Sequence, residues 1–266
     1  MQYVVDDLDG RVLAGLAGAV AGERRAGVPT GAALLVAAAE SAAASGGFDP
    51  DDLRSRSLDA APPAGLSGVL LPALAYGLLT PADRPQFRRS AHRVARLAQA
   101  DEGTAMTAVA AAVLAADLLR FDVEWCLTRL HQTLLEEAPQ GLLDRLQPLP
   151  DSAPLRGDQD PGAALQIAIT ALTRTDASVP GVLDELDAYG EELTAAYSLA
   201  AAFAGIHTGT AGDPGSAGAD WLDATPQHVR DAAGALSAAA RALLPRPAPA
   251  LPGSATTIES PGHDRT

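Results

Sequence analysis

The sequence predicts an all-α fold built as a single compact domain. Apolar residues recur at helical spacing along almost the whole chain, and no run alternates with the period of two that marks a half-buried strand. Hydrophobic residues make up 47% of the chain but aromatic residues only 4%, so alanine supplies much of the apolar content. Small residues also recur four apart at Ala14, Gly18 and Gly22. We therefore expect helices that pack through close approach of their backbones.

Clusters of Gly, Pro, Ser and Asp separate the apolar segments and set the expected boundaries. In chain order, the expected helices cover residues 9–22, 31–45, 50–57, 64–78, 81–99, 103–119, 122–136, 160–173, 178–188, 191–206 and 226–244. Residues 147–162 and 208–218 are too rich in breakers to be helical, so we expect loops there. The expected domain covers residues 1–244, and the composition of residues 245–266 predicts a disordered tail.

Three helix starts carry a recognisable cap. Asp49 precedes a proline, and Thr80 and Thr225 do the same. A short polar side chain can accept a hydrogen bond from the first backbone N–H groups of a helix, and proline is favoured at the first helical position. We expect each of these three residues to cap the helix that follows it.

The charge and the cysteine content exclude several classes of function. The chain has 33 acidic residues against 19 arginines and a net charge of −14, which repels nucleic acid and anionic membranes. Cys126 is the single cysteine, so neither an intrachain disulfide nor a cysteine-based zinc cluster can form, and we expect it to be buried. The N-terminus is acidic where a signal peptide would be basic, which predicts a cytoplasmic protein. The apolar runs 105–116 and 193–206 are shorter than the ~20 residues of a membrane span.

Two segments near the N-terminus resemble motifs of one enzyme family. Residues 15–23 read Gly-Leu-Ala-Gly-Ala-Val-Ala-Gly-Glu, and residues 30–41 read Thr-Gly-Ala-Ala-Leu-Leu-Val-Ala-Ala-Ala-Glu-Ser. They are similar to the first two motifs of the ADP-ribosylglycohydrolases, a helix ending in Gly-Asp-Ala and a Thr-Asp-Asp-Thr helix with an Ala-Glu-Ser end. Glu23 stands at the aspartate of the first motif. Residues 29–32, Pro-Thr-Gly-Ala, stand at Thr-Asp-Asp-Thr, so both aspartates are absent and Thr30 stands at the first of them.

Further segments continue the resemblance in the family's own order. Residues 65–77 are similar to the family's Gly-x-x-Met-Arg-x-x-Pro-x-Gly stretch without its arginine, and Gln99 stands where the family has a histidine. In the last metal-binding motif, Gly-x-Asp-x-Asp-Thr, Glu191 matches the first aspartate, Leu193 the second and Thr194 the threonine. The segment Ala-Asp-Trp-Leu at 219–222 resembles the family's Pro-x-x-Trp-Leu ending. Most of residues 10–225 is covered.

The resemblance implies an orthogonal helical bundle of the ADP-ribosylglycohydrolase type whose metal site is eroded. Enzymes of that family hold two divalent cations with aspartates and threonines beside the ribose of the substrate. Hard cations such as Mg²⁺ require several oxygen ligands, and three of the family's carboxylates are missing here. We therefore predict no catalytic residue and no metal ligand. The expected remnant pocket consists of Glu23, Thr30, Gln99, Glu191 and Thr194.

Other clusters in the sequence have simpler interpretations. The acidic run Asp6, Asp7, Leu8 and Asp9 is typical of a solvated helix start. The arginine-rich segment 88–96, which contains His92, could bind a phosphate-bearing ligand or could be a solvated basic face that pairs with acidic neighbours. The sequence has no Gly-rich phosphate loop, no Gly-x-Ser-x-Gly turn and no Cys/His nucleophile arrangement.

Three functions are compatible with the composition and the resemblance. The first is a non-catalytic binding or regulatory relative of the family, which binds a partner protein or an ADP-ribose-like ligand and needs no cofactor. The alternative is a divergent hydrolase that removes ADP-ribose with an altered site holding Mg²⁺ or Mn²⁺. The third is a structural helical module without a ligand. None of the three predicts a nucleic-acid or membrane partner.

Overall fold

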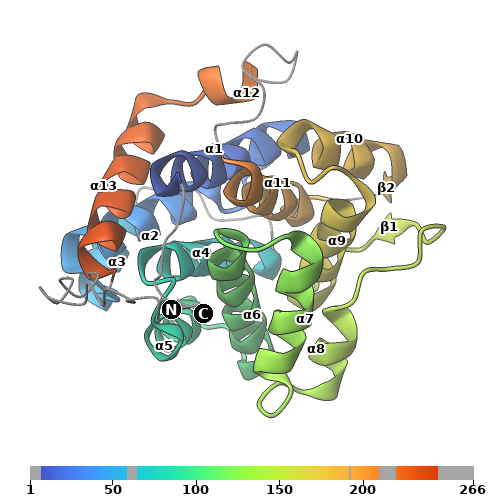
Figure 1. Ribbon diagram of the computed structural model, residues 1–266, viewed down its shortest axis with the longest axis horizontal. Helices are drawn as coiled ribbons and strands as arrows, with labels where there is room; N and C mark the ends of the chain where they lie inside the picture. Colours follow the sequence, from blue (N-terminus) through green and yellow to red (C-terminus); the bar gives the residue numbers. More distant parts are fainter. Residues whose placement is uncertain (1–6, 59–64, 192, 210–219, 245–266) are drawn as a thin grey trace, which may run out of the picture.

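The computed structural model describes residues 7–58, 65–191, 193–209 and 220–244, and these form one bundle of helices (Figure 1). The helices and the two short strands are, in chain order, α1 (Leu8–Ala26), α2 (Ala32–Ser45), α3 (Pro50–Ser57), the 3₁₀ helix η1 (Leu66–Leu70), α4 (Leu71–Leu79), α5 (Arg84–Leu97), α6 (Glu102–Leu118), α7 (Val123–Leu134), α8 (Gln140–Arg145), β1 (Leu155–Arg156), α9 (Pro161–Arg174), α10 (Val179–Tyr189), β2 (Gly190–Glu191), α11 (Ala195–Thr208), α12 (Asp220–Asp223) and α13 (Gln227–Leu243).

The all-α prediction is confirmed. The strands β1 and β2 have two residues each and pair in parallel, Leu155 with Gly190 and Arg156 with Glu191. A ladder of this length forms no layer of its own. Its effect is local, because it ties the connection between α8 and α9 to the chain just before α11.

Most of the expected helices are present within a few residues of their expected bounds. The expected helix at 64–78 is instead divided into η1 and α4, and α8 and α12 were not expected. Both unexpected helices are short, six and four residues, and too few apolar positions fall within them to show a helical period. The expected loop 208–218 and the expected tail 245–266 lie largely or wholly outside the described residues.

Two of the three expected caps are wrong. Asp83, not Thr80, caps α5 by accepting a hydrogen bond from the N–H of Gln86 at 3.0 Å, because the chain makes a turn between the two residues before the helix begins. The hydroxyl of Thr225 donates backward to the carbonyl oxygen of Trp221 in α12, so α13 begins without a side-chain cap. A polar residue followed by proline therefore predicts that a helix starts nearby, but not which residue caps it.

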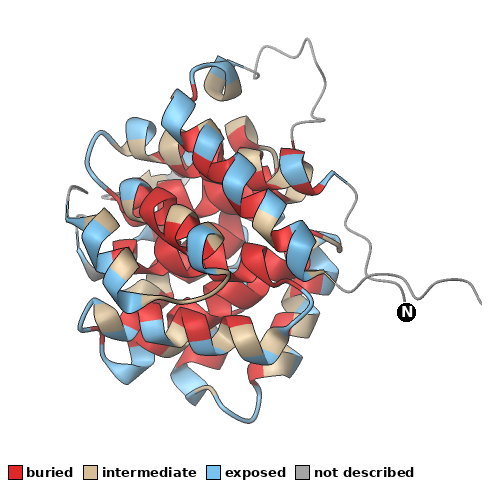
Figure 2. Cartoon of the chain, turned by 90° about the vertical axis from the view of Figure 1, so that its left-hand side faces the viewer, coloured by how far each residue is buried: buried red, intermediate tan, exposed pale blue. Residues whose placement is uncertain are grey.

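The core lies around three helices that are almost wholly buried. Every residue of α4 is buried, and α6 and α11 are buried along most of their length. In Figure 2 the buried segments fill the centre of the bundle and the exposed ones form its outer faces. The apolar runs 105–116 and 193–206 therefore belong to core helices. No helix among the described residues has the length and apolar content needed to cross a membrane.

Glycines let α1 and α11 pack backbone against backbone. A Cβ atom built on Gly18 would lie closer than 3.0 Å to the carbonyl oxygen of Ala201, and one built on Gly22 would meet the carbonyl oxygen of Tyr197 in the same way. From the other helix, a Cβ on Gly205 would overlap the backbone of α1. The expectation from the small residues spaced four apart is thus confirmed, and α1 is fixed closely against α11.

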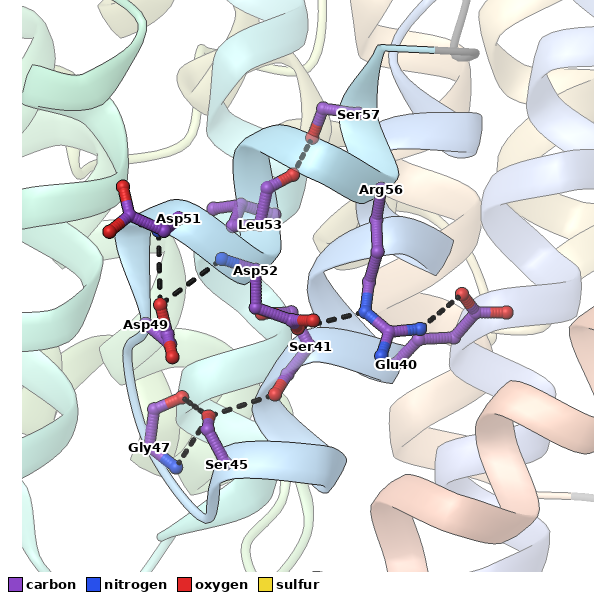
Figure 3. Close-up of polar contacts among 10 residues, drawn as sticks. All are labelled: Glu40, Ser41, Ser45, Gly47, Asp49, Asp51, Asp52, Leu53, Arg56 and Ser57. Atoms are coloured by element: carbon purple, nitrogen blue, oxygen red, sulfur yellow. Dashed lines mark hydrogen bonds and ion pairs between the residues drawn. The ribbon is translucent and has the colours of Figure 1, made fainter.

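The corner between α2 and α3 holds the third expected cap, and this one is confirmed (Figure 3). Asp49 accepts hydrogen bonds from the N–H groups of Asp51 and Asp52 at 3.0 and 3.1 Å. One turn later, Arg56 donates to Asp52 at 2.8 Å and to Glu40 of α2 at 3.2 Å. These bonds stabilise the corner that follows the resembling segment 30–41 and tie it back to Glu40 of that segment.

Cys126 is fully buried in α7, as expected. Burial raises the pKa of its thiol, and the nearby carboxylates of Asp117 and Asp122 raise it further. A thiol held in the protonated form is a poor nucleophile. Cys126 therefore serves as a small apolar residue of the core.

Candidate functional site

Two helix starts and one helix end meet at the place where the sequence motifs converge. Thr30, just before α2, is 1% exposed, and its hydroxyl lies in short hydrogen-bond contact with the hydroxyl of Ser198 in α11. Ser198 lies four residues after Thr194, on the same face of the helix. The first, second and last motifs of the resemblance are thereby brought together.

Glu23 caps helix α2 from the end of helix α1. Its Oε2 accepts hydrogen bonds from the N–H groups of Thr30 at 2.8 Å, Gly31 at 3.2 Å and Ala32 at 3.1 Å, and from the hydroxyl of Thr30 at 3.2 Å. The reason lies in the sequence, because the N-cap residue Gly31 has no side chain that could accept these bonds. A carboxylate is also favoured at the positive end of the helix dipole. Since the Thr30 hydroxyl donates its hydrogen to Glu23, Ser198 donates to Thr30.

Asp158 caps helix α11 in the same manner. Its Oδ2 accepts hydrogen bonds from the N–H groups of Thr194 at 2.6 Å and Ala196 at 2.9 Å, and its Oδ1 lies 3.3 Å from the Thr194 hydroxyl. Asp158 is fully buried. It reaches this position because β1 pairs with β2, which holds the loop beside the start of α11. We call Glu23, Thr30, Asp158, Thr194 and Ser198 the capped site.

The 3₁₀ helix η1 covers the capped site. A Cβ atom built on Gly31 would lie 2.5 Å from the carbonyl oxygen of Gly68, and one built on Gly65 would lie 2.7 Å from Oε1 of Gln159. The Nε2 atom of Gln159 in turn lies 3.4 Å from the hydroxyl oxygen of Thr194. The third resembling segment, residues 65–77, is thus packed against the second and the last.

A hollow of about 510 Å³ opens beside the capped site, and Gln159, which contacts Thr194, lies in its lining. Its polar lining comprises Asp101, Thr104, Thr107, Arg145, Gln159 and Asp160. Burial opposes ionisation of Asp160, but hydrogen bonds from Arg145 and from backbone N–H groups outweigh it and hold its pKa below the usual value. Hydrogen bonds from Thr104 lower the pKa of Asp101. Both carboxylates are therefore ionised at neutral pH. Asp101 caps the start of α6, and Asp160 caps the start of α9.

The five residues of the expected remnant pocket are only partly gathered. Glu23 and Thr30 are in direct contact, and Thr194 lies one turn from Ser198, which contacts Thr30. Gln99 lies at the end of α5 with a positive φ of 61°, and its side chain is exposed and makes no hydrogen bond within the described part of the chain. Glu191 belongs to β2, but its side chain lies outside the description.

Sequence reasoning missed Asp158 and Ser198. The loop 147–162 contains three aspartates, Asp151, Asp158 and Asp160, but nothing in its composition shows which of them reaches the start of α11. Ser198 lies four residues after Thr194 in the expected helix 191–206, and that helical spacing was the available signal.

The residues present do not fit a pair of divalent cations. Such a pair needs several carboxylate oxygens that are free to coordinate, since about four positive charges must be balanced. Here Glu23 and Asp158 already accept hydrogen bonds from backbone N–H groups, and Leu193, at the position of the second aspartate, is buried at 8% exposure. Among the described positions, no three His, Cys, Asp or Glu side chains lie close enough together to hold an ion.

The sequence matches no protein-family model and no curated protein. The fold, by contrast, matches a solved structure described as an ADP-ribosylglycohydrolase-related protein complex, with a TM-score of 0.71 and 18% sequence identity. The match covers 88% of this chain and 99% of the other. At this identity the likeness establishes the fold, and the fold expected from the motif resemblance is thereby confirmed.

Proposed function

We propose that this protein is a non-catalytic binding or regulatory relative of the ADP-ribosylglycohydrolases and that it holds an ADP-ribose-like ligand beside the capped site. The observation that carries the proposal is the use of Glu23 and Asp158 as helix caps. In this arrangement the carboxylates stabilise the fold, and Oε2 of Glu23 and both oxygens of Asp158 are engaged by hydrogen bonds.

The energetics favour the caps over metal ligation. A cation that took Oε2 of Glu23 as a ligand would compete with three backbone N–H donors at the start of α2. Each buried donor left without a partner costs about 1–3 kcal/mol. The same cost applies at α11, where Asp158 is fully buried. Leu193 adds apolar surface where a ligand would be required.

The hollow beside the capped site supports the choice of ligand. Its volume of about 510 Å³ lies within the range of roughly 300–1,000 Å³ that is usual for small-molecule sites. Thr104 and Gln159 offer polar groups suited to ribose hydroxyls. Arg145 is paired with Asp160, so a phosphate of the ligand would have to take the place of that carboxylate. The related structure is described by its likeness to ADP-ribosylglycohydrolases, so ADP-ribose is the first ligand to test.

The alternative is a divergent hydrolase with an altered metal site. One observation favours it, because Asp158 brings to Thr194 a carboxylate that the motif comparison did not find. Glu23 and Asp158 would then have to exchange their helix N–H donors for a cation when substrate binds.

A thermal-melt series separates these functions. A ligand at ~100 times its dissociation constant stabilises the folded state by about 2.7 kcal/mol. We expect ADP-ribose to raise the melting temperature, Mg²⁺ and Mn²⁺ alone to leave it unchanged, and no ADP-ribose to be released from a modified protein. Stabilisation that requires metal, together with release of ADP-ribose, would establish the hydrolase instead.

A pair of glutamine variants locates the ligand. Gln159→Leu removes an amide that lines the hollow, so it should abolish the shift produced by ADP-ribose. Gln166→Leu makes the same change in α9, where the amide bonds only the carbonyl of Gln147, and the shift should persist. If neither variant alters the shift, the ligand binds elsewhere. If ADP-ribose leaves the wild-type melt unchanged, the ligand is wrong.

A further inference from the structure

Helix α5 concentrates positive charge on an otherwise acidic protein. Five of the 19 arginines of the chain, together with His92, lie within its fourteen residues. The net charge of the whole chain is −14.

Most of these groups are already paired. Arg84 donates to both carboxylate oxygens of the buried Asp117, at 2.7 and 2.8 Å. Arg88 pairs with Glu137, and Nε2 of His92 lies 3.0 Å from Glu102. These partners come from α6 and from the chain after α7, so the pairs join α5 to its neighbours. Arg96 donates to the carbonyl oxygen of Ala100 at 2.6 Å.

Arg89 and Arg93 are different. Both are exposed, and neither makes a hydrogen bond or an ion pair with any residue that the structure describes. They lie four residues apart, so they are neighbours on one face of the helix, about 6 Å apart along its axis. Two adjacent guanidinium groups that no carboxylate of the described residues neutralises form a ready binding point for anions.

The two arginines line a hollow with an apolar floor. It has a volume of about 400 Å³, and Met106 and Val109 of α6 lie at its apolar side. Arg88 also lines it, but Glu137 offsets its charge. His92 lines it as well and lies against Glu102. The surplus positive charge of the hollow thus comes from Arg89 and Arg93. A ligand that fits it must combine negative charges with an apolar group.

We propose that this hollow docks an extended acidic segment of a partner protein. In an extended chain, alternate side chains point to one side and lie about 6.6 Å apart, which matches the spacing of Arg89 and Arg93. Two carboxylates at alternate positions would each meet one guanidinium group. The next residue on the same side, if apolar, would enter the hollow against Met106 and Val109.

Charge complementarity favours this occupant over nucleic acid. A nucleic acid presents one charge for every phosphate over a long stretch, and beyond the two free arginines it would meet a chain with an excess of fourteen negative charges. A short segment with two or three carboxylates needs only the local patch. The surface is built from residues other than those of the capped site, so it is independent of the function proposed above.

Fluorescence anisotropy with a defined probe tests the proposal. The probe is a labelled peptide Glu-Ala-Glu-Ala-Leu flanked by glycines, and its matched control carries glutamine in place of glutamate. We expect the glutamate peptide to bind, the glutamine peptide to bind at least about tenfold more weakly, and binding to be lost at ~1 M salt, where the screening length is about 3 Å. Replacing the leucine of the probe by serine should also weaken binding.

Two double variants identify the surface. Arg89→Gln with Arg93→Gln should raise the dissociation constant at least about tenfold. Arg54→Gln with Arg241→Gln removes the same charge from two exposed arginines elsewhere and should leave it unchanged. Melting curves check that both variants fold. Equal loss in both variants, no binding of the probe to the wild type, or stronger competition by a single-stranded oligonucleotide would overturn the proposal.

Discussion

Substitution of Glu23 tests directly whether the capped site stabilises the fold. Glu23→Ala removes the acceptor for three backbone N–H groups and an anion at the start of α2. We expect a loss of about 1–3 kcal/mol in the free energy of unfolding, measured by urea denaturation. The matched variant Glu40→Ala, in α2, removes only a partly exposed pair with Arg56 and should cost less than about 1 kcal/mol. Equal losses would show that Glu23 does not act as a cap.

His207 predicts how stability responds to mild acid. Burial lowers its pKa from the ordinary value of about 6.5, and the positive charge of Arg11 lowers it further, although Asp122 opposes this. The folded state therefore favours the neutral imidazole. Below about pH 6.5 the unfolded chain takes up a proton that the folded chain resists, so the stability present at higher pH falls with acid.

Denaturation between pH 7 and pH 5 measures this effect. The urea midpoint of the wild type should fall as the pH falls, and His207→Gln should flatten the slope because glutamine cannot take up the proton. Parallel curves for the two proteins would mean that His207 titrates alike in the folded and unfolded states.

Individual residues also show how much of the candidate site could be predicted from the sequence. Glu23, Thr30 and Thr194 were found from the sequence because each lies at the end of an expected helix and at a motif position. Asp158 was not found, because its place depends on the pairing of β1 with β2, some 35 residues apart in the chain. Gln99 was placed in the expected pocket, yet it has an exposed side chain at the end of α5. Motif order alone could not reveal which side chains point inward.

At the scale of elements, a glycine in the contact between α1 and α11 and an exposed glycine of α13 should respond oppositely to substitution by alanine. Gly18→Ala would force a Cβ atom against the carbonyl group of Ala201, so we expect a loss of about 1–3 kcal/mol or more. Gly234→Ala in α13 meets nothing within 4 Å and should raise stability by about 0.5–1 kcal/mol, because alanine favours the helix. Thermal melts of both variants compare them directly. A tolerated Gly18→Ala would show that the two helices can separate at little cost.

Helix existence was easier to predict than helix ends. Long helices with many apolar positions, such as α6 and α13, were found within a residue or two of their bounds. Helix starts depend on which polar group satisfies the first N–H donors. At α2 that group is Glu23 of the preceding helix, and at α11 it is Asp158, which lies 36 to 38 residues earlier in the chain. The predicted caps at Thr80 and Thr225 are wrong for related reasons. Asp83, which is nearer to α5, accepts the N–H of Gln86, and the hydroxyl of Thr225 is bonded to the carbonyl oxygen of Trp221.

For the whole molecule, the net charge of −14 predicts a dependence on salt. Many of the ion pairs are exposed, as between Arg54 and Asp51, and exposed pairs stabilise little. The sum of the long-range repulsion is larger, so screening it should stabilise the fold. Raising NaCl from ~0.01 M to ~0.15 M shortens the screening length from about 30 Å to about 8 Å and should raise the melting temperature. A lower melting temperature would mean that the ion pairs outweigh the repulsion.

The sequence alone determined that this protein is a bundle of helices with a seam of small residues and the order of motifs of the ADP-ribosylglycohydrolase fold. These properties depend on neighbours along the chain, on periodicity and on the absence of a Cβ atom at particular positions. Only the tertiary structure decided what the remaining carboxylates do. Glu23 and Asp158 accept the N–H groups of helices that they do not belong to, and such partners are set by packing between segments that no local pattern records.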